Sequence, residues 1–247
     1  MVLWKKKMPK LEDKPFYEVS KIAGKVFDEK TVHVLASLIH KKAFVGLDYP
    51  ISTGKEAIVF RARAAEGFVA VKVFKFETTA FRRMQDYITG DPRFRLKHSL
   101  RENVKLWARK EFSNLKTCFK AGLSVPEPIF RKDNVVVMEF LGEEGVPFAL
   151  LEHVVLENPQ KVYEDVVEQT RKIYSLGLIH ADLSSFNIIM KHDKPFIIDF
   201  GQAVVKEHPK AGFFLRKDCN NIASFFARAG VDTNADEVFS KVTSTQP

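Results

Sequence analysis

The residues of this sequence best suited to chemistry lie in two short stretches that are close together in the chain. The stretch Leu178–Ile189 reads LIHADLSSFNII and places Asp182 and Asn187 between apolar runs, and Asp199 follows in IIDFG. A loop carboxylate can take a proton from a hydroxyl, while an asparagine five residues on and a second carboxylate can hold magnesium on phosphate oxygens. The apolar flanks would anchor the loop so that only its polar groups face a cleft. The pattern H-x-D-x-x-x-x-N followed by I-D-F-G therefore indicates phosphoryl transfer of the kinase type.

Lys72 and Glu111 are candidates for holding the phosphates. Lys72 lies within FVAVKVFKF, a run that predicts a strand. Alternate side chains of this strand face opposite ways, with Val69, Val71 and Val73 on one face and Ala70, Lys72 and Phe74 on the other. A lysine buried alone is costly, so it needs an anion, which phosphate oxygens and a helix carboxylate would supply. Taken singly, Lys72 is better explained by a solvated strand face and Glu111 by a solvated helix face; beside the two loop motifs, both favour phosphate binding.

The hexapeptide STGKEA, Ser52–Ala57, lies between the first predicted helix and the first predicted strand. It is short, polar and glycine-bearing, and it stands where a kinase has its phosphate loop. It is neither G-x-G-x-x-G nor a Walker loop, because the required glycine and the following Ser/Thr are missing. Its residues alone leave two readings open, a phosphate loop and a surface turn.

The elements that must position these residues follow from hydrophobic periodicity and turn residues. Apolar residues at helical spacing predict helices over 28–43, 102–122, 161–175 and 217–229. Apolar runs predict strands over 57–62, 68–76, 134–142 and 196–199, with a hairpin turn at Glu66–Gly67. Segment 82–101 is polar, strongly basic and interrupted by GDP, which predicts a long loop. Strands dominate the first half and helices the second, which predicts an α+β fold with an N-terminal sheet lobe and a C-terminal helical lobe.

Composition narrows the class of protein. The chain has 247 residues, 45% of them hydrophobic and 28% charged, which is typical of a globular protein and excludes a disordered one. Cys118 and Cys219 are the two cysteines and lie far apart, so no disulfide framework or cysteine-based metal site is expected. Residues 1–14 read as a charged arm without the apolar core of a signal peptide, and no apolar run is long enough to span a membrane. We therefore expect a cytoplasmic protein without a membrane partner, and its net charge of +8 favours phosphate-rich partners.

Five stretches, STGKEA, VAVK, WARKEFSNL, IHADLSSFNI and IDFGQAV, together closely resemble the RIO family of atypical protein kinases, and STGKEA points to its first branch. The resemblance covers residues 15–230, nearly the whole chain. It implies a two-lobed protein-kinase-like fold whose C-terminal helical lobe is reduced. The implied division is an arm over 1–14 and a kinase domain over 15–247, with an N-lobe over about 45–138, a hinge over 139–142 and a C-lobe over 143–247.

The same resemblance implies ATP and Mg²⁺ in the cleft, with Mn²⁺ as an alternative ion. Asp182 would be the base, Asp199 and Lys72 would complete the catalytic set, and Asn187 and Asp199 would be the metal ligands. Backbone groups of Glu139–Leu141, after the gatekeeper-like Met138, would take the adenine. The residues implied for ATP binding are Ser52, Thr53, Gly54, Lys55, Glu56, Lys72, Glu111, Met138, Glu139 and Leu141.

The implied activity is that of an atypical serine/threonine protein kinase and ATPase that autophosphorylates. Asp199 is also implied as a phosphate acceptor, and the implied role is maturation of the small ribosomal subunit, with its precursor and ribosomal RNA as partners. The chain departs from ordinary protein kinases at Ala181, where they carry arginine, and at Ser184, where they carry a catalytic lysine. After Gly201 the sequence has no A-P-E and little room for peptide-docking helices. These departures favour slow autophosphorylation or ATP hydrolysis; the protein substrate is left open.

Two other functions stay open. One is a small-molecule kinase of the aminoglycoside or choline type, against which STGKEA and GQAV argue. The other is a nucleotide-switched RNA-binding or ribosome-binding assembly factor with little kinase activity. The basic loop supports the second, since cations interleave with aromatic rings that suit phosphate and base contacts, although a solvated mobile loop fits the same composition. The residues concerned are Arg82, Arg83, Arg93, Arg95, Lys97 and Arg101, with Phe81, Tyr87 and Phe94.

Overall fold

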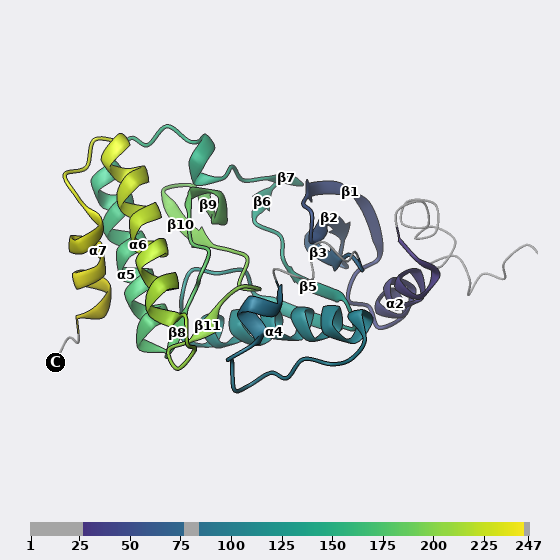
Figure 1. The fold of residues 1–247 in the computed structure, drawn as a ribbon. Coiled ribbons are helices and arrows are strands. Elements are labelled where there is room, and N and C mark those ends of the chain that lie inside the picture. Colours follow the sequence, from purple (N-terminus) through teal and green to yellow (C-terminus); the bar gives the residue numbers. More distant parts are fainter. Residues whose placement is uncertain (1–26, 77–83, 245–247) are drawn as a thin grey trace, which may run out of the picture.

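The computed structural model describes residues 27–76 and 84–244. The predicted arm over 1–14 lies outside these residues. Figure 1 shows α2 at one end of the molecule and α5, α6 and α7 at the other, with a sheet and the long α4 between them. No helix in the described ranges combines the length and apolar character needed to cross a membrane.

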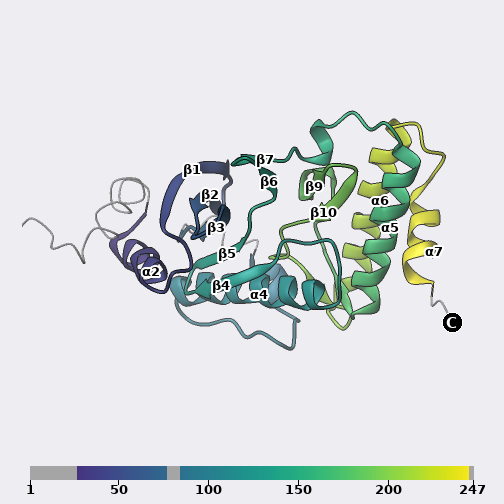
Figure 2. The ribbon, with the colours of Figure 1, turned by 180° about the vertical axis from the view of Figure 1, so that it is seen from behind.

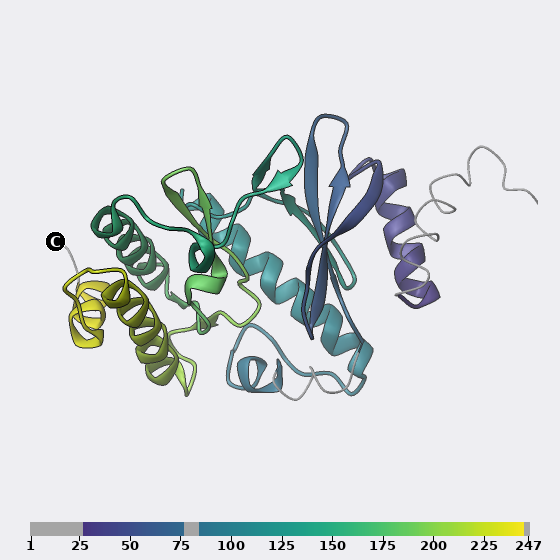
Figure 3. The same cartoon turned by 90° about the horizontal axis from the view of Figure 1, so that it is seen from above.

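The N-terminal lobe is a five-stranded antiparallel sheet with strand order β1-β2-β3-β5-β4. Its strands are β1 Gly46–Thr53, β2 Ala57–Arg63, β3 Phe68–Phe74, β4 Pro128–Lys132 and β5 Val135–Glu139. Helix α2, Glu29–His40, covers one face, and α4, Leu100–Lys120, covers the other (Figure 3). The predicted faces of β3 are confirmed: Val69, Val71 and Val73 pack in the α2 cluster, and Ala70 and Phe74 in the α4 cluster. Lys72 therefore points to the side of the sheet that faces α4.

The C-terminal lobe is mainly helical, as predicted. Helix α5, Pro159–Ser175, packs beside α6, Ala211–Arg228, and α7, Ala235–Thr243 (Figures 1 and 2). Six short strands in residues 142–205 form three antiparallel pairs. They are β6 Gly142–Glu143 with β7 Val146–Pro147, β8 Leu178–Ile179 with β11 Val204–Val205, and β9 Ile188–Lys191 with β10 Lys194–Ile197. The 3-10 turns are η2 Leu151–His153 and η3 Ser185–Asn187.

Several predicted boundaries were wrong. Strand β1 was missed, because Pro50 and two register shifts break its alternation, and the first two residues of STGKEA belong to it. Asp199 does not lie inside a strand, because β10 ends at Ile197 and Asp199 has a left-handed backbone with φ of 64°. Helix α6 begins well before residue 217, and α4 begins at Leu100. Strands β4, β6, β7, β8, β9 and β11 and helix α7 were not predicted.

The prediction of a long loop over 82–101 is confirmed for residues 89–99, which form no helix or strand, but was wrong for residues 84–88 and 100–101. Residues 84–88 are helical, and Met84, Ile88 and Phe94 are buried in the core. Tyr87 stacks on Phe214 of α6 with ring centroids 5.0 Å apart. Tyr87 and Phe94 therefore pack inward and do not offer free faces for nucleic-acid bases, whereas Phe81 lies outside the described residues.

Candidate active site

The loop that carries Asp182 is fixed by helix α6. The Asp218 carboxylate accepts hydrogen bonds from the backbone N–H groups of Ala181 at 2.7 Å and Leu183 at 2.8 Å. Asn221, also on α6, donates to the Leu183 carbonyl at 2.9 Å. Ala181 has φ of 68°, a conformation that costs a non-glycine residue about 1–3 kcal/mol and persists only where its surroundings hold it. Burial raises the pKa of Asp218 to about 8, against the effect of the two backbone donors.

The Asp182 carboxylate is surrounded by hydrogen-bond donors. Its Oδ1 accepts from Lys217 Nζ at 2.8 Å, and its Oδ2 accepts from Gln202 Nε2 at 3.1 Å. Asn187 Nδ2 donates to the Asp182 backbone carbonyl at 2.7 Å and lies 3.4 Å from Oδ2. Asp182 and Asn187 thus lie together as the sequence pattern requires. Lys217 and Gln202 were missed, because only the tertiary structure brings α6 and the segment after Asp199 to this loop.

Lys72 links a helix carboxylate to Asp199. Its ammonium lies 2.8 Å from Glu111 Oε1 and 2.9 Å from Asp199 Oδ1. Lys72 and Glu111 are buried, whereas the Asp199 side chain is 47% exposed. β3, α4 and the turn after β10 supply these three residues, and the contact joins the two lobes.

The electrostatics of these three residues follow from burial and from one another's charge. Desolvation opposes ionisation of Lys72, but Asp199 and Glu111 overcome it and raise the pKa of its ammonium. Desolvation likewise opposes ionisation of Asp199, but the adjacent Lys72 outweighs it and lowers the pKa of that carboxyl. Burial raises the pKa of Glu111 to about 7 despite Lys72, and within the described chain Glu111 Oε2 has no hydrogen-bond partner. The cleft therefore presents an ionised Asp199 held by a charged Lys72.

Helix α4 also fixes the segment that follows Asp199. Lys110 Nζ donates to the carbonyls of Gly201, at 3.0 Å, and Ala203. Asn114 Nδ2 donates to the carbonyls of Phe200 at 3.1 Å and Ala203 at 3.0 Å. Lys110 is fully buried, and burial lowers its pKa to about 7. Two polar side chains of one helix therefore bind three backbone carbonyls of the segment that directly follows Asp199.

Gly201 permits this close approach of α4. A Cβ atom at that position would lie 3.0 Å from Trp107 Nε1 and 3.2 Å from Glu111 Oε2, tighter than ordinary contacts. The indole and the carboxylate could not both stay in place beside a larger residue. A larger residue at this position of the D-F-G sequence would therefore require Trp107 or Glu111 to shift by a few tenths of an ångström.

STGKEA forms the turn between β1 and β2. Ser52, Thr53, Gly54 and Lys55 are exposed at the end of the sheet, and the Gly54 N–H donates to the Ala57 carbonyl at 2.9 Å. Glu56 is partly buried and lies near enough to Glu111 for its charge to contribute to the raised pKa of that residue. The turn therefore lies on the side of the sheet that carries Lys72.

The predicted hinge follows β5. Met138 is buried in the same cluster as Ala57 and Ala70, on the cleft face of the sheet. The Glu139 N–H donates to the Glu127 carbonyl at 2.8 Å, and the Leu141 carbonyl accepts from the Phe148 N–H at 3.0 Å. These two backbone groups are therefore already paired inside the protein.

The donor set near Asp199 fits a magnesium ion shared with phosphates. Mg²⁺ usually takes one or two protein oxygens together with phosphate and water oxygens. The Ile198 N–H donates to the Asn187 carbonyl at 3.0 Å, so Asn187 and Asp199 lie on neighbouring backbone, and Asn187 commits its amide nitrogen to Asp182. No group of three or more His, Cys, Asp or Glu side chains among the described residues could hold a metal by itself.

His180 has a structural environment. Its Nε2 lies 3.0 Å from the Ile198 carbonyl, its ring packs edge-on against Phe200, and burial lowers its pKa. A buried ring that joins the two motif loops indicates a structural residue and not a base.

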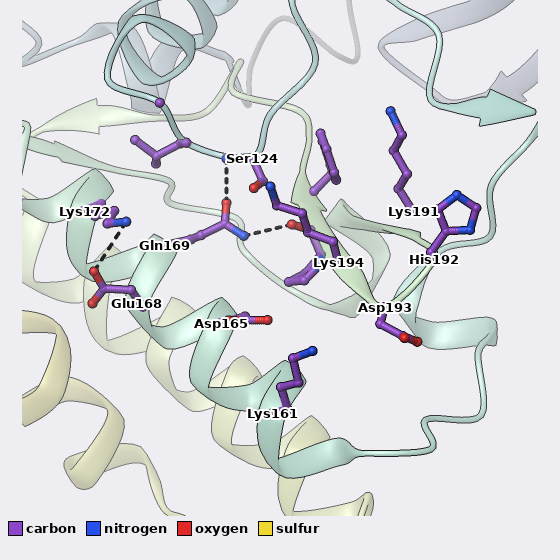
Figure 4. Close-up of a pocket in the computed structure, with 14 residues that line it drawn as sticks. Ser124, Lys161, Asp165, Glu168, Gln169, Lys172, Lys191, His192, Asp193 and Lys194 are labelled. Atoms are coloured by element: carbon purple, nitrogen blue, oxygen red, sulfur yellow. Dashed lines mark hydrogen bonds and ion pairs between the residues drawn. The ribbon is translucent and has the colours of Figure 1, made fainter.

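A cavity of about 780 Å³ lies elsewhere, between α5 and the β9–β10 hairpin (Figure 4). Gln169 crosses its floor, accepting from the Ser124 N–H at 3.1 Å and donating to the Pro195 carbonyl at 2.8 Å. Lysines and carboxylates of mixed sign line it, and none of the predicted site residues does. This cavity is therefore separate from the Asp182 and Asp199 cleft.

Comparison with known proteins agrees with this geometry. A family model described as the RIO domain matches residues 58–238. The chain is 43% identical, over 92% of its length and 79% of the relative's, to RIO-type serine/threonine-protein kinase Rio1 of Haloferax volcanii. It is 38% identical to the protein of the same name in Methanocaldococcus jannaschii, over 95% of this chain and 81% of that one. The Rio2 kinase–ADP/Mg²⁺–phosphoaspartate complex from Chaetomium thermophilum has a TM-score of 0.68 at 24% identity, covering 87% of this chain and 67% of that one. That structural likeness confirms the predicted two-lobed kinase fold.

Proposed function

This chain belongs to the RIO family of atypical serine/threonine protein kinases, and from that premise we propose which residues perform the reaction. Lys72 holds the phosphates of ATP, and Asp182 is the base that receives the proton of the attacking hydroxyl. Residues Ser52–Glu56 of the STGKEA turn cover the phosphates, and Met138, Glu139 and Leu141 line the part of the site that binds the adenine ring. The observation that carries this assignment is the single ammonium of Lys72 placed 2.8 Å from Glu111 and 2.9 Å from Asp199.

The proposed reaction is transfer of the terminal phosphoryl group of ATP. The hydroxyl oxygen forms a bond to the γ-phosphorus, the bond from that phosphorus to the ADP oxygen breaks, and Asp182 takes the hydroxyl proton. Magnesium, held by Asn187 and Asp199 with Mn²⁺ as a substitute, would neutralise charge on the phosphate oxygens. Asp218 and Asn221 keep the backbone of the Asp182 loop in place during the step.

We also propose that Asp199 can accept the phosphoryl group itself. The matched Rio2 complex contains phosphoaspartate together with ADP and Mg²⁺. In this chain, the Asp199 carboxylate is ionised, its side chain is 47% exposed, and Lys72 lies 2.9 Å from its Oδ1. A carboxylate in that state is a suitable nucleophile.

The wider role that we propose is autophosphorylation or ATP hydrolysis during maturation of the small ribosomal subunit, in the cytoplasm. The net charge of +8 supports contact with RNA-rich particles. The division into an arm, an N-lobe over 45–138, a hinge over 139–142 and a C-lobe over 143–247 belongs to the same proposal. A nucleotide-switched assembly factor is a second candidate, supported by Arg95 and Lys97, which are exposed on the basic segment.

The chemical stability of the labelled protein tests the proposal. The purified protein is incubated with γ-labelled ATP and Mg²⁺, and the product is then treated with acid or with hydroxylamine. Acid-stable label shows a Ser or Thr ester, and label released by hydroxylamine but absent from Asp199→Asn shows the acyl phosphate. Failure to form either product, with no ADP released, would contradict the proposed activity.

A further inference from the structure

Asp182 faces a cation that its own loop does not supply. The segment from Ala181 to Asn187 reads ADLSSFN and contains neither lysine nor arginine. The cation comes from α6, where Lys217 places its Nζ 2.8 Å from Asp182 Oδ1. Phosphoryl transfer is accelerated chiefly by positive groups placed where charge develops between the nucleophile and the phosphate. Lys217 lies beside Asp182, the proposed base, whereas Lys72 pairs with Asp199.

The backbone of Lys217 is held firmly relative to the catalytic loop. Its neighbour Asp218 accepts from two backbone N–H groups of the loop, and Asn221, one turn on, donates to the Leu183 carbonyl. These three contacts leave the loop and this part of α6 little freedom to separate. The ammonium of Lys217 therefore stays within reach of Asp182 while its flexible stem allows it to change partner.

The environment of the Lys217–Asp182 pair is unlike that of a buried structural ion pair. The two side chains are 39% and 37% exposed, so both reach solvent at the point where a substrate hydroxyl must approach Asp182. Ion pairs of this exposure contribute little to folding stability, and salt weakens them. Desolvation lowers the pKa of Lys217, but the contact with Asp182 outweighs it and raises the pKa, so the side chain is cationic at neutral pH.

We propose that Lys217 is a further catalytic residue, which moves from Asp182 Oδ1 to the oxygens of the phosphoryl group in transfer; this rests on the proposed function. As the hydroxyl oxygen bonds to the γ-phosphorus and the bond to ADP breaks, the ammonium stabilises the charge on the equatorial oxygens. Its departure frees Asp182 Oδ1 to receive the hydroxyl proton. Gln202 remains on Oδ2 at 3.1 Å and keeps the carboxylate oriented.

The test compares Lys217→Met, Lys217→Arg and Lys217→Ala with a matched control. Lys210→Met is the control, because Lys210 is the N-cap residue of the same helix and forms an exposed ion pair with Asp86 at 3.2 Å. We expect Lys217→Met to lower kcat about a hundredfold to a thousandfold while the Kd for ATP changes less than about threefold. Lys217→Arg should keep part of the activity, Lys210→Met should keep all of it, and a small alkylammonium should partly restore Lys217→Ala.

The outcomes separate this inference from the proposed function. If Lys217→Met keeps wild-type kcat while Asp182→Asn loses it, Lys217 is not catalytic and the assigned base stands. If neither variant loses activity, the proposed assignment of Asp182 as the base is wrong as well, whereas absence of all activity from the wild-type protein would contradict the proposed function itself. Equal losses of ATP binding and kcat in Lys217→Met, or no rescue of Lys217→Ala by any alkylammonium, would assign Lys217 a structural role and overturn the inference.

Discussion

Lys110 is a fully buried lysine beside the cleft, and its replacement by methionine has an effect on stability that depends on pH. Its Nζ donates to the carbonyls of Gly201 and Ala203, and among the described residues no carboxylate lies within ion-pair distance. Burial lowers its pKa from 10.5 to about 7. A neutral amine keeps two N–H donors, which match the two carbonyl acceptors, so the uncharged form suits the site.

The magnitude follows from proton linkage. Between pH 7 and 10.5 the unfolded chain binds a proton at Lys110 that the folded protein does not, so the wild-type free energy of unfolding rises with pH in that window. This extra stability of the wild-type protein is lost as pH falls from 10.5 toward 7, by about 1.4 kcal/mol per pH unit. Lys110→Met has no such group. The wild-type protein should therefore gain about 2 kcal/mol over the variant between about pH 7.5 and about pH 9.

Urea unfolding of both proteins at several pH values measures this difference. Lys116→Met is the matched control, since Lys116 is exposed on the same helix, and its difference from wild type should stay flat over the same range. A flat difference for Lys110→Met as well would show that the lysine keeps its ordinary proton affinity when folded. The reasoning from burial would then be refuted.

Three further perturbations have defined outcomes. Asp218→Ala leaves two buried backbone N–H groups of the Asp182 loop without acceptors. The free energy of unfolding should fall by about 2–6 kcal/mol in urea titrations, and kcat should fall as well. A loss of stability under about 1 kcal/mol would contradict the anchoring role of Asp218. Gly201→Ala should destabilise the protein by about 1–3 kcal/mol and weaken Mg²⁺-dependent turnover, and unchanged turnover would show that the neighbours can move apart. Arg95→Glu with Lys97→Glu should reduce the salt slope of ribosomal RNA binding by about 2 without changing ATP affinity, and an unchanged slope would place the RNA contact elsewhere.

The positions of the site residues along the chain could be predicted because they depend on local pattern. The alternation of β3 determines which face Lys72 occupies, and the helical spacing of α4 places Glu111 on its buried side. The two loop motifs carry Asp182 and Asp199 at a fixed spacing that the chemistry requires. These features need no knowledge of how distant segments pack.

The partners that complete the cleft could not be predicted in the same way. Lys217 reaches Asp182 only because Asp218 and Asn221 bind α6 to the catalytic loop, a tertiary arrangement with no local signature. The sequence provides only a weak indication of the role of Lys110. This lysine lies on the apolar side of the helix in LWARKEF, and a buried lysine needs a hydrogen-bond acceptor.

Missed elements and inward-facing rings have separate causes. Helix α7 had a usable N-cap signal, because Asn234 accepts from the Glu237 N–H at 3.0 Å. The aromatic residues of segment 82–101 suggested nucleic-acid contact, but Tyr87 stacks on Phe214 and Phe94 is buried in the core. Composition alone does not distinguish a packed ring from an exposed one.

The most direct test of phosphoryl transfer in this cleft is parallel measurement of ADP released and γ-labelled phosphate incorporated. The full chain is compared with Lys72→Met, Asp182→Asn and Asp199→Asn, with urea unfolding as the check that each variant is folded. We predict Mg²⁺-dependent release of ADP by the wild-type protein and a loss of about a hundredfold or more in each variant. Wild-type rates in any folded variant of this set would contradict the assignment of that residue, and wild-type rates in all three would place the reaction outside this cleft.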